Sequence, residues 1–213
     1  MDQNTAAATA LRMQRLAKTL EGNNFDVVCL ETKEQVIPTL ETMIEKTETV
    51  SVGGSMTLFE TGVIDWLRTW GCTFHDRYAP GLTGEQMSDI FRGAFTDDVY
   101  LTSTNAVTEA GELVNIDGNG NRVAAMLFGP KRVIVVVGMN KLVADVEAAF
   151  ARIQEVAAPA NALRLGLKTP CAATGRCMHC DSPAKICRKA TIMGSQGDKG
   201  RVTVILVAEP LGY

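Results

Sequence analysis

The stretch Arg132–Val137 (RVIVVV) carries a continuous run of β-branched residues that ends at Gly138. A strand without polar alternation is buried on both faces, as in parallel sheets that are covered by helices. Other apolar runs of strand length occur at Phe25–Leu30, Val50–Val52, Cys72–Asp76, Val99–Thr102 and Arg201–Ala208. Together these runs predict a sheet of mainly parallel strands.

Segments with helical periodicity separate these strands. One of them opens with a capping box, in which Thr83 is the N-cap and Gln86 lies three residues on. The predicted helices are Asp2–Leu20, Thr32–Lys46 with Pro38 near its start, Thr57–Trp70, Thr83–Phe95 and Lys141–Ala157. A hairpin strand is expected at Glu112–Ile116. This alternation predicts an α/β fold of three layers, with an open, mostly parallel sheet between helices.

The chain has 213 residues, of which 46% are hydrophobic and 21% charged, which fits one large globular domain. We expect residues 1–213 to form a single domain, with a cysteine-rich segment, 168–190, before the last strand. A net charge of -3 argues against nucleic acid as a partner. No apolar stretch is long enough for a membrane span, and no signal peptide is visible. These features predict a cytoplasmic protein whose cysteines are reduced.

A first candidate site is the turn that contains Gly53, Gly54 and Ser55, between a strand and the helix that includes Thr57. Glycines allow a ligand to approach the backbone, and free N–H groups at a helix start attract anions. Ligands of such sheets bind where strands end. The alternative interpretation is a plain βα turn capped by Ser55 or Thr57.

A second candidate is the polar segment after the Val99–Thr102 strand. Its density of hydrogen-bonding side chains exceeds what turns require, although Asn and Asp also favour turns for conformational reasons. Glu109 is the acid/base candidate, and Arg122 would pair with a substrate carboxylate or phosphate. Either could instead form a solvated surface ion pair. The candidate ligand-binding residues of this segment are Asn105, Thr108, Asn115, Asp117, Asn121 and Arg122.

The third candidate is the set of four cysteines at Cys171, Cys177, Cys180 and Cys187. Four thiolates match the stoichiometry of a zinc or iron–sulfur site, and we favour iron–sulfur. His179 is an alternative ligand, and reduced or partly disulfide-linked cysteines are the alternative to a metal. Cys29 and Cys72 are expected in the core.

Two further residues have weaker claims. His75 precedes Asp76, but neighbours in an extended segment point to opposite faces, so no dyad is expected. Glu60 follows the Gly53–Gly54 turn by less than two helical turns and is a second candidate catalytic carboxylate.

Three stretches resemble the lactate-utilisation (LUD) domain family, of the LutC/YkgG type. They are SVGGSMTLFETG (51–62), DVYLTSTNAVTEAGELVNIDGNGNRVAAMLFGPKRVIVVVGMNKLV (98–143) and the tail that runs from TPCAATGRCMHCDSPAKICR to VILVAEPLGY. The resemblance implies a fold similar to the sugar-phosphate isomerase and CoA-transferase (NagB/RpiA-like) group. It also implies a bacterial role in oxidising L-lactate to pyruvate beside iron–sulfur subunits. The cysteine quartet resembles a stand-alone branch of the family rather than LutC itself.

Three functions follow as hypotheses. The first is a LutC-type protein that binds a small carboxylate or phosphorylated ligand, with iron–sulfur oxidoreductase subunits or a second copy of the chain as candidate protein partners. The second is an isomerase or CoA-transferase-like enzyme that uses Glu109 or Glu60 as base or nucleophile. The third is a regulatory protein that senses metal or redox state through its cysteines.

Overall fold

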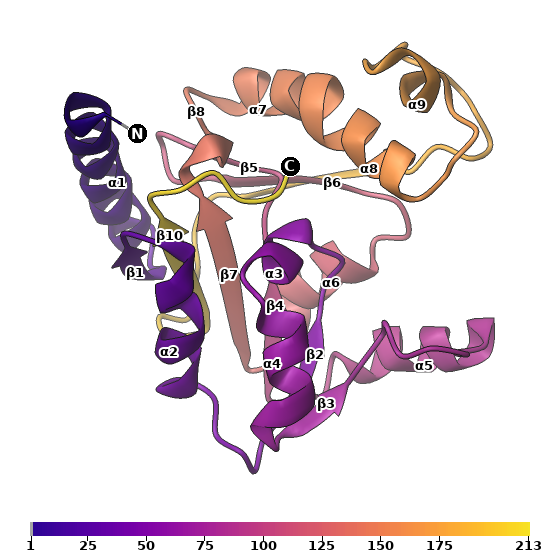
Figure 1. Cartoon of the computed structure of the whole chain (residues 1–213), viewed down its shortest axis with the longest axis horizontal. Coiled ribbons are helices and arrows are strands. Elements are labelled where there is room, and N and C mark those ends of the chain that lie inside the picture. Colours follow the sequence, from indigo (N-terminus) through magenta and orange to yellow (C-terminus); the bar gives the residue numbers. More distant parts are fainter. Residues whose placement is uncertain (1) are drawn as a thin grey trace.

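The structure is a computed structural model that describes residues 2–213. Six parallel strands form the main sheet in the order β1-β10-β7-β4-β2-β3 (Figure 1). Their bounds are β1 Asp26–Leu30, β2 Thr49–Val52, β3 Thr73–His75, β4 Val99–Thr102, β7 Arg132–Gly138 and β10 Val202–Val207. The expected α/β class with an open, mostly parallel sheet is confirmed.

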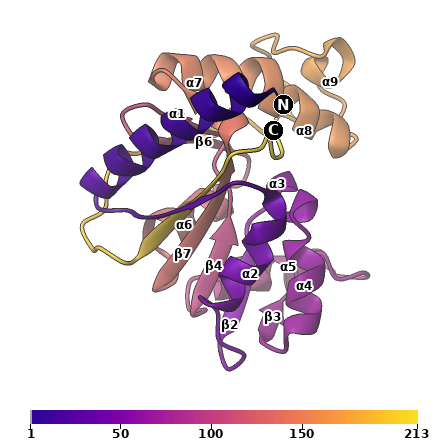
Figure 2. The same ribbon diagram turned by 60° about the vertical axis from the view of Figure 1, so that its left-hand side comes forward.

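Helices cover both faces of this sheet (Figure 2). Side chains of β7 alternate between the two layers: Val133, Val135 and Val137 pack in the core under α1 and α6. Ile134 and Val136 pack in the core under α2, α3 and α4. The helices are α1 Gln3–Gly22, α2 Val36–Glu41, α3 Met56–Glu60, α4 Val63–Trp70, α5 Gly84–Gly93 and α6 Asn121–Phe128. Burial on both faces explains the unbroken β-branched run in β7.

A second, smaller sheet lies beyond the carboxyl edge of the main sheet (Figure 1). Its strand order is β8-β5-β6-β9, with β6 antiparallel to both β5 and β9 and with β5 parallel to β8. Its strands are β5 Ala106–Thr108, β6 Leu113–Asp117, β8 Leu142–Val143 and β9 Lys189–Met193. Helices pack on it through a small core of Ala106, Val114, Ala149 and Ile153. These helices are α7 Val146–Arg152, the π-helical turn η3 Ile153–Ala157 and α8 Ala158–Arg164, and α9 Pro170–Thr174 packs against α8.

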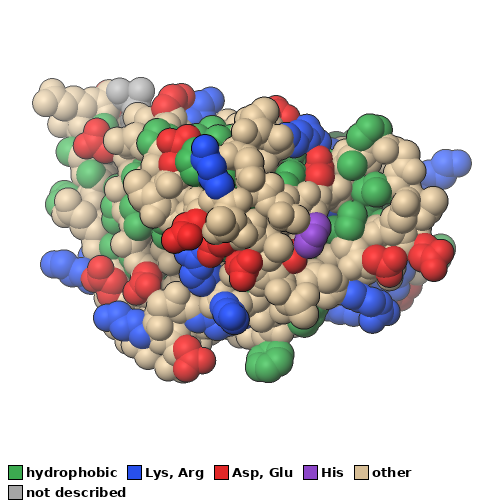
Figure 3. Space-filling model, turned by 90° about the horizontal axis from the view of Figure 1, so that it is seen from below, with side chains coloured by type: hydrophobic (Ala, Val, Ile, Leu, Met, Phe, Trp, Pro, Cys, Tyr) green, Lys and Arg blue, Asp and Glu red, His purple; other side chains and the backbone are tan. Residues whose placement is uncertain are grey.

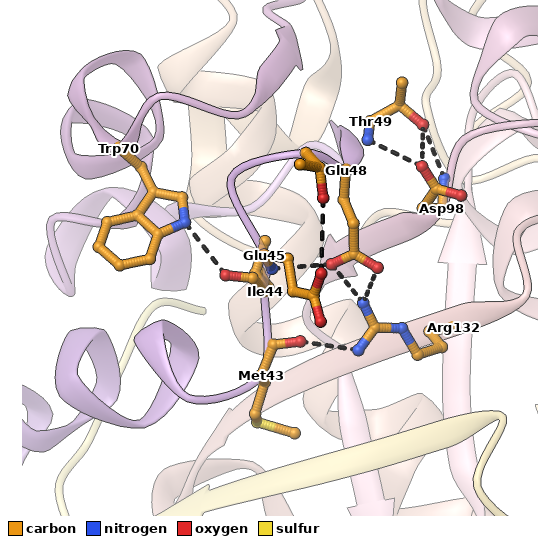
Figure 4. Close-up of polar contacts among 9 residues, drawn as sticks. Met43, Ile44, Glu45, Glu48, Thr49, Trp70, Asp98 and Arg132 are labelled. Atoms are coloured by element: carbon orange, nitrogen blue, oxygen red, sulfur yellow. Dashed lines mark hydrogen bonds and ion pairs between the residues drawn. The ribbon is translucent and has the colours of Figure 1, made fainter.

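The amino edge of the main sheet is tied together by charged side chains (Figure 4). Arg132, which opens β7, donates from one nitrogen to both carboxylate oxygens of Glu48 at 2.5 and 2.6 Å and from another to the Met43 carbonyl at 2.7 Å. Asp98 accepts from the backbone and hydroxyl of Thr49 at 2.9 and 2.8 Å. Charges of both signs are interspersed on this face (Figure 3). Hydrogen bonds and ion pairs therefore hold the starts of β2, β4 and β7 together at this edge.

Several predicted elements differ in the structure. The helix expected over Thr57–Trp70 is two helices, because Gly62 adopts a left-handed φ of 72° between them. The helix expected over Thr32–Lys46 is a 3-10 turn, η1 Lys33–Gln35, followed by α2, which ends at Glu41. Capping of α5 by Thr83 and Gln86 is as expected.

The helix expected over Lys141–Ala157 is wrong at its start. Residues Met139–Lys141 form the 3-10 turn η2, then β8 follows, and α7 begins at Val146 with Asp145 as its N-cap. At its other end the helical segment continues past the expected end at Ala157, through α8 to Arg164. No helix among residues 2–213 is long and apolar enough to cross a membrane.

Candidate functional site

A cavity of about 230 Å³ lies where the carboxyl edge of the main sheet meets the second sheet and α8. The turns that follow β2, β4 and β6 all contribute to its lining, as does the start of α6. Two distant segments of the chain, the Gly53–Ser55 turn and the Asn-rich segment from Asn105 to Arg122, thus share one hollow. The residues that the sequence predicted as ligand-binding and that line this cavity are Gly54, Ser55, Asn105, Asp117, Asn121 and Arg122.

Gly53 is the buried base of the β2–α3 turn. Its N–H donates to the Leu101 carbonyl at 2.8 Å, and a Cβ at this position would lie 2.5 Å from the Thr102 hydroxyl and 3.0 Å from Cγ of Arg122. Gly54 faces the cavity, where a Cβ would meet only Arg77 at 3.7 Å. Ser55 caps α3 by accepting from the Leu58 N–H at 3.4 Å. The capping interpretation of this turn is therefore confirmed, and the approach of a ligand to its backbone stays a prediction.

Arg122 holds the Asn-rich loops in place. Its side chain is buried and donates to the Ser103 carbonyl at 3.0 Å and to Oδ1 of Asn115 at 2.5 Å. The second terminal nitrogen donates to Oδ1 of Asn105 at 3.2 Å and to the Ile116 carbonyl at 3.3 Å. All four acceptors are uncharged. Burial lowers the pKa of Arg122, and nearby Asp117 offsets part of that effect.

Lys141 is a deeply buried basic group of the cavity. It is 2% exposed, and its ammonium donates to the hydroxyls of Thr57 and Ser103, both at 2.9 Å. Burial, with repulsion from Arg152 and Arg122, lowers its pKa to about 7. A lysine poised in this way can accept or release a proton near neutral pH, and a bound anion would favour its charged form.

Arg77, from the loop after β3, brings another cation to the cavity. Its guanidinium stacks 4.5 Å from the Phe91 ring centroid of α5. Within the described residues, its Nε is buried without a hydrogen-bond partner, and no carboxylate pairs with its side chain. Arg164 of α8 also lines the cavity, where its guanidinium is held by Oδ1 of Asn161.

The cavity as a whole is cationic. Among its described lining residues, Arg77, Arg122, Lys141 and Arg164 are basic, and Asp117 is the single acid. Asp117 is already engaged, since its carboxylate accepts from the N–H groups of Gly118 at 2.9 Å and Val123 at 3.2 Å. The arrangement favours a small anion.

The remaining predicted residues lie outside the lining. Thr57 and Asn115 stand directly behind it, bonded to Lys141 and Arg122 respectively. Thr108 is buried and bonds to Glu112. Glu109 lies on the side of β5 near α1, where it faces Arg15 at 3.6 Å as an exposed ion pair.

Glu60 also lies outside the lining: it is exposed, and its carboxylate accepts from the Gly212 N–H at 2.7 Å. Neither candidate catalytic carboxylate reaches the cavity.

The sequence interpretation missed Lys141, Arg77 and Ser103. A signal for Lys141 was available, because it follows the most clearly predicted strand by three residues.

His75 does not pair with its neighbour Asp76, as expected from strand geometry. Its Nδ1 lies 2.9 Å from the buried carboxylate of Asp97, which also accepts from the Ser51 hydroxyl. Asp76 instead pairs with Arg68 at 2.8 Å. His75 therefore serves the edge of the sheet rather than the cavity.

The four clustered cysteines line a second cavity of about 210 Å³. Within the described part of the chain, no three His, Cys, Asp or Glu side chains converge closely enough to hold a single metal ion. The expected metal or cluster stays a prediction. The expectation that Cys29 lies in the core is wrong, because edge strand β1 leaves it exposed; Cys72 is half-buried.

Comparisons with known proteins agree on the fold. A model of the LUD domain matches residues 13–207. No curated protein sequence matches the chain. A solved DUF162 family protein from Deinococcus radiodurans is 16% identical, covering 93% of this chain and 98% of that chain with a TM-score of 0.50.

Two partial structural matches are also found. Ribose 5-phosphate isomerase A from Neisseria gonorrhoeae is 14% identical, with a TM-score of 0.33 over 54% of each chain. The eIF2B delta subunit from Chaetomium thermophilum is 18% identical, with a TM-score of 0.36 over 56% of this chain and 50% of that one.

Proposed function

This chain belongs to the LUD domain family, and we propose that it binds a small anionic metabolite in the cavity at the carboxyl edge of its main sheet. The observation that carries the proposal is the charge of the lining, in which four basic side chains face one engaged carboxylate. Buried positive charge without carboxylate partners is costly, and a bound anion would compensate it.

The contacts indicate that the basic residues of the cavity have different roles. Arg122 donates to four uncharged acceptors and so acts mainly as a support for the surrounding loops. Arg77 has unengaged donors beside Gly54, where the backbone leaves room for a ligand. A larger fraction of Lys141 would be protonated when the anion is bound, because an anion raises the pKa of a buried lysine.

The size of the cavity restricts the ligand to a small molecule. At about 230 Å³ it is below the roughly 300–1,000 Å³ of pockets for drug-sized ligands. A short carboxylic acid or a small phosphorylated compound fits this volume. The resemblance to LutC-type proteins supports a 2-hydroxy or 2-oxo acid, and with it a role in the oxidation of L-lactate to pyruvate beside iron–sulfur oxidoreductase subunits.

An isomerase or acyl-transferring enzyme is a second candidate, and it is supported by Lys141. A general base works best when its pKa lies near the working pH, as the pKa of Lys141 does. Such an enzyme would use Lys141 rather than Glu109 or Glu60, since neither carboxylate lines the cavity. Proton exchange of a bound 2-hydroxy or 2-oxo acid with solvent deuterium, lost in a Lys141→Met variant, would support this candidate.

Isothermal titration calorimetry tests the anion proposal. Lactate, pyruvate, inorganic phosphate, sugar phosphates and CoA esters are titrated into the protein, and we expect at least one to bind. An Arg77→Ala variant should weaken that binding by about tenfold or more, in line with the roughly 1.5–3 kcal/mol of a charged hydrogen bond. The control is Arg132→Ala, which removes an arginine from the opposite edge of the sheet. Silence across the whole panel would overturn the proposal.

A further inference from the structure

The cysteine-lined cavity lies next to the anion cavity but is a separate hollow. Cys171 belongs to α9, Cys177 and Cys180 to the loop after it, and Cys187 to the segment just before β9. All four line one space of about 210 Å³. The proposed anion site uses none of these thiols except Cys187, which lies on the wall that the two cavities share.

All four thiols border one hollow, and among the described residues no three of them are grouped around a single point. Zinc binds sulfur at about 2.3 Å in a tetrahedron, so a zinc site would bring four sulfurs into mutual contact around one ion. Among the described residues no three metal-ligating side chains are grouped in that way, although all four cysteines border the same space. Four thiols that border one space of this size are the ligand number of an iron–sulfur cluster, which is larger than a single ion.

Much of the wall between the thiols is apolar. Ile116, Ile153, Ala158 and Ile186 line this cavity, contributed by β6, η3, α8 and the loop before β9. A hydrophobic surround limits solvent access to a cluster and helps to set its potential. All four cysteines of the segment 168–190 line this one cavity.

The backbone around the Cys-x-x-Cys pair is arranged to hold thiolate sulfur. His179 has a left-handed φ of 49°, a conformation that is uncommon for residues other than glycine. In this conformation its N–H points at Sγ of Cys177 at 3.4 Å. The Thr169 hydroxyl lies 3.3 Å from Sγ of Cys171, within reach to donate to it when the sulfur is a thiolate. Donors to sulfur favour the thiolate form and are a regular feature around ligated cysteines.

From this arrangement we infer that Cys171, Cys177, Cys180 and Cys187 bind an iron–sulfur cluster in the cavity that they line. Each thiol loses its proton to solvent as its iron–sulfur bond forms, and ligation itself leaves the oxidation state of the protein unchanged. Lys185 lines the same cavity and would offset part of the thiolate charge. The inference does not depend on the proposed anion site.

The test is metal and sulfide analysis of the full chain purified anaerobically, and again after reconstitution with ferrous iron and sulfide. We expect iron and acid-labile sulfide in equal amounts, and a visible absorbance that bleaches on reduction with dithionite. Stoichiometric zinc in a colourless protein would overturn the inference. Protein that takes up neither iron nor sulfide on reconstitution would overturn it as well.

Matched variants locate the cluster. Cys177→Ser and Cys180→Ser should lose most of the iron and sulfide, whereas Cys29→Ser and Cys72→Ser, outside the cavity, should keep both. Circular dichroism verifies that each variant is folded. Unchanged iron and sulfide in the folded Cys177→Ser and Cys180→Ser variants would contradict the assignment. Analysis of the wild-type chain decides the matter even if a variant fails to fold.

Discussion

Gly53 and Gly54 are adjacent, but their surroundings differ. A Cβ on Gly53 would lie 2.5 Å from the Thr102 hydroxyl and 3.0 Å from Arg122, whereas one on Gly54 would meet Arg77 at an ordinary 3.7 Å. We expect Gly53→Ala to lower the free energy of unfolding by about 1–3 kcal/mol, as overpacking does. Gly54→Ala is the control and should change it by less than about 0.5 kcal/mol. Urea denaturation measures both, and equal stability of the two variants would contradict this account of the turn.

Lys141 makes stability depend on pH. Its pKa is about 7 in the folded protein and 10.5 in a model peptide, because burial disfavours the charged form. Between these values the unfolded chain binds a proton that the folded chain lacks, so the free energy of unfolding rises with pH across this window. The penalty of burying the charge is complete below pH 7 and is relieved as the pH approaches 10.5.

We therefore predict that the wild-type chain gains stability relative to Lys141→Met as the pH rises from about 7 to 10, by up to roughly 1.4 kcal/mol per unit. Methionine is uncharged and fills a similar volume, so the variant should lack this slope. Denaturant unfolding of both proteins at several pH values measures the difference. Parallel curves would show that Lys141 keeps its ordinary pKa.

At the scale of elements, the starts of β2 and β7 are held together by Arg132, which contacts both Glu48 and the Met43 carbonyl (Figure 4). Arg132→Ala should destabilise the protein by about 1–3 kcal/mol, because it removes charge-assisted hydrogen bonds and leaves Glu48 half-buried without its partner. Binding in the cavity should be unchanged, since the cavity lies at the opposite edge of the sheet. Thermal unfolding and calorimetry on one preparation test both statements.

The sequence predicts well those elements whose apolar residues follow the pattern of the buried faces. The β-branched run of β7 is buried on two faces, and the periodic apolar residues of α1 pack against the sheet. Of the second sheet only β6 was predicted. Strands β5 and β8 have three and two residues, too few for a periodic signal, and the five-residue strand β9 was also missed. Helix α6 was missed because it begins directly after an Asn- and Gly-rich turn, with Gly120 at a φ of 88°.

The candidate site could be predicted only in part, because some of its residues come together only in the tertiary structure. Arg122 and Asn105 were identified from residue density, and both line the cavity. Glu109 was assigned to the same site because it lies four residues from Asn105 in sequence, but β5 between them directs it toward α1. Arg77 and Lys141 come from distant loops that only the tertiary structure brings to the cavity.

For the whole molecule, the central feature is a cationic cavity between two sheets. The main sheet supplies rigid strand ends, and the second sheet with α8 covers them. Such a site binds through preorganised charge, and the affinity should follow the protonation of Lys141. A bound anion raises the pKa of Lys141, so above pH 7 binding must take up a proton.

The most direct test is the affinity of the best-binding anion from the calorimetric panel, measured from about pH 6 to pH 9 in buffers of different ionisation enthalpy. We predict a nearly constant dissociation constant below pH 7, weakening by up to about tenfold per pH unit above it, with net proton uptake that Lys141→Met abolishes. An affinity that does not change with pH, and is the same in Lys141→Met, would contradict the account.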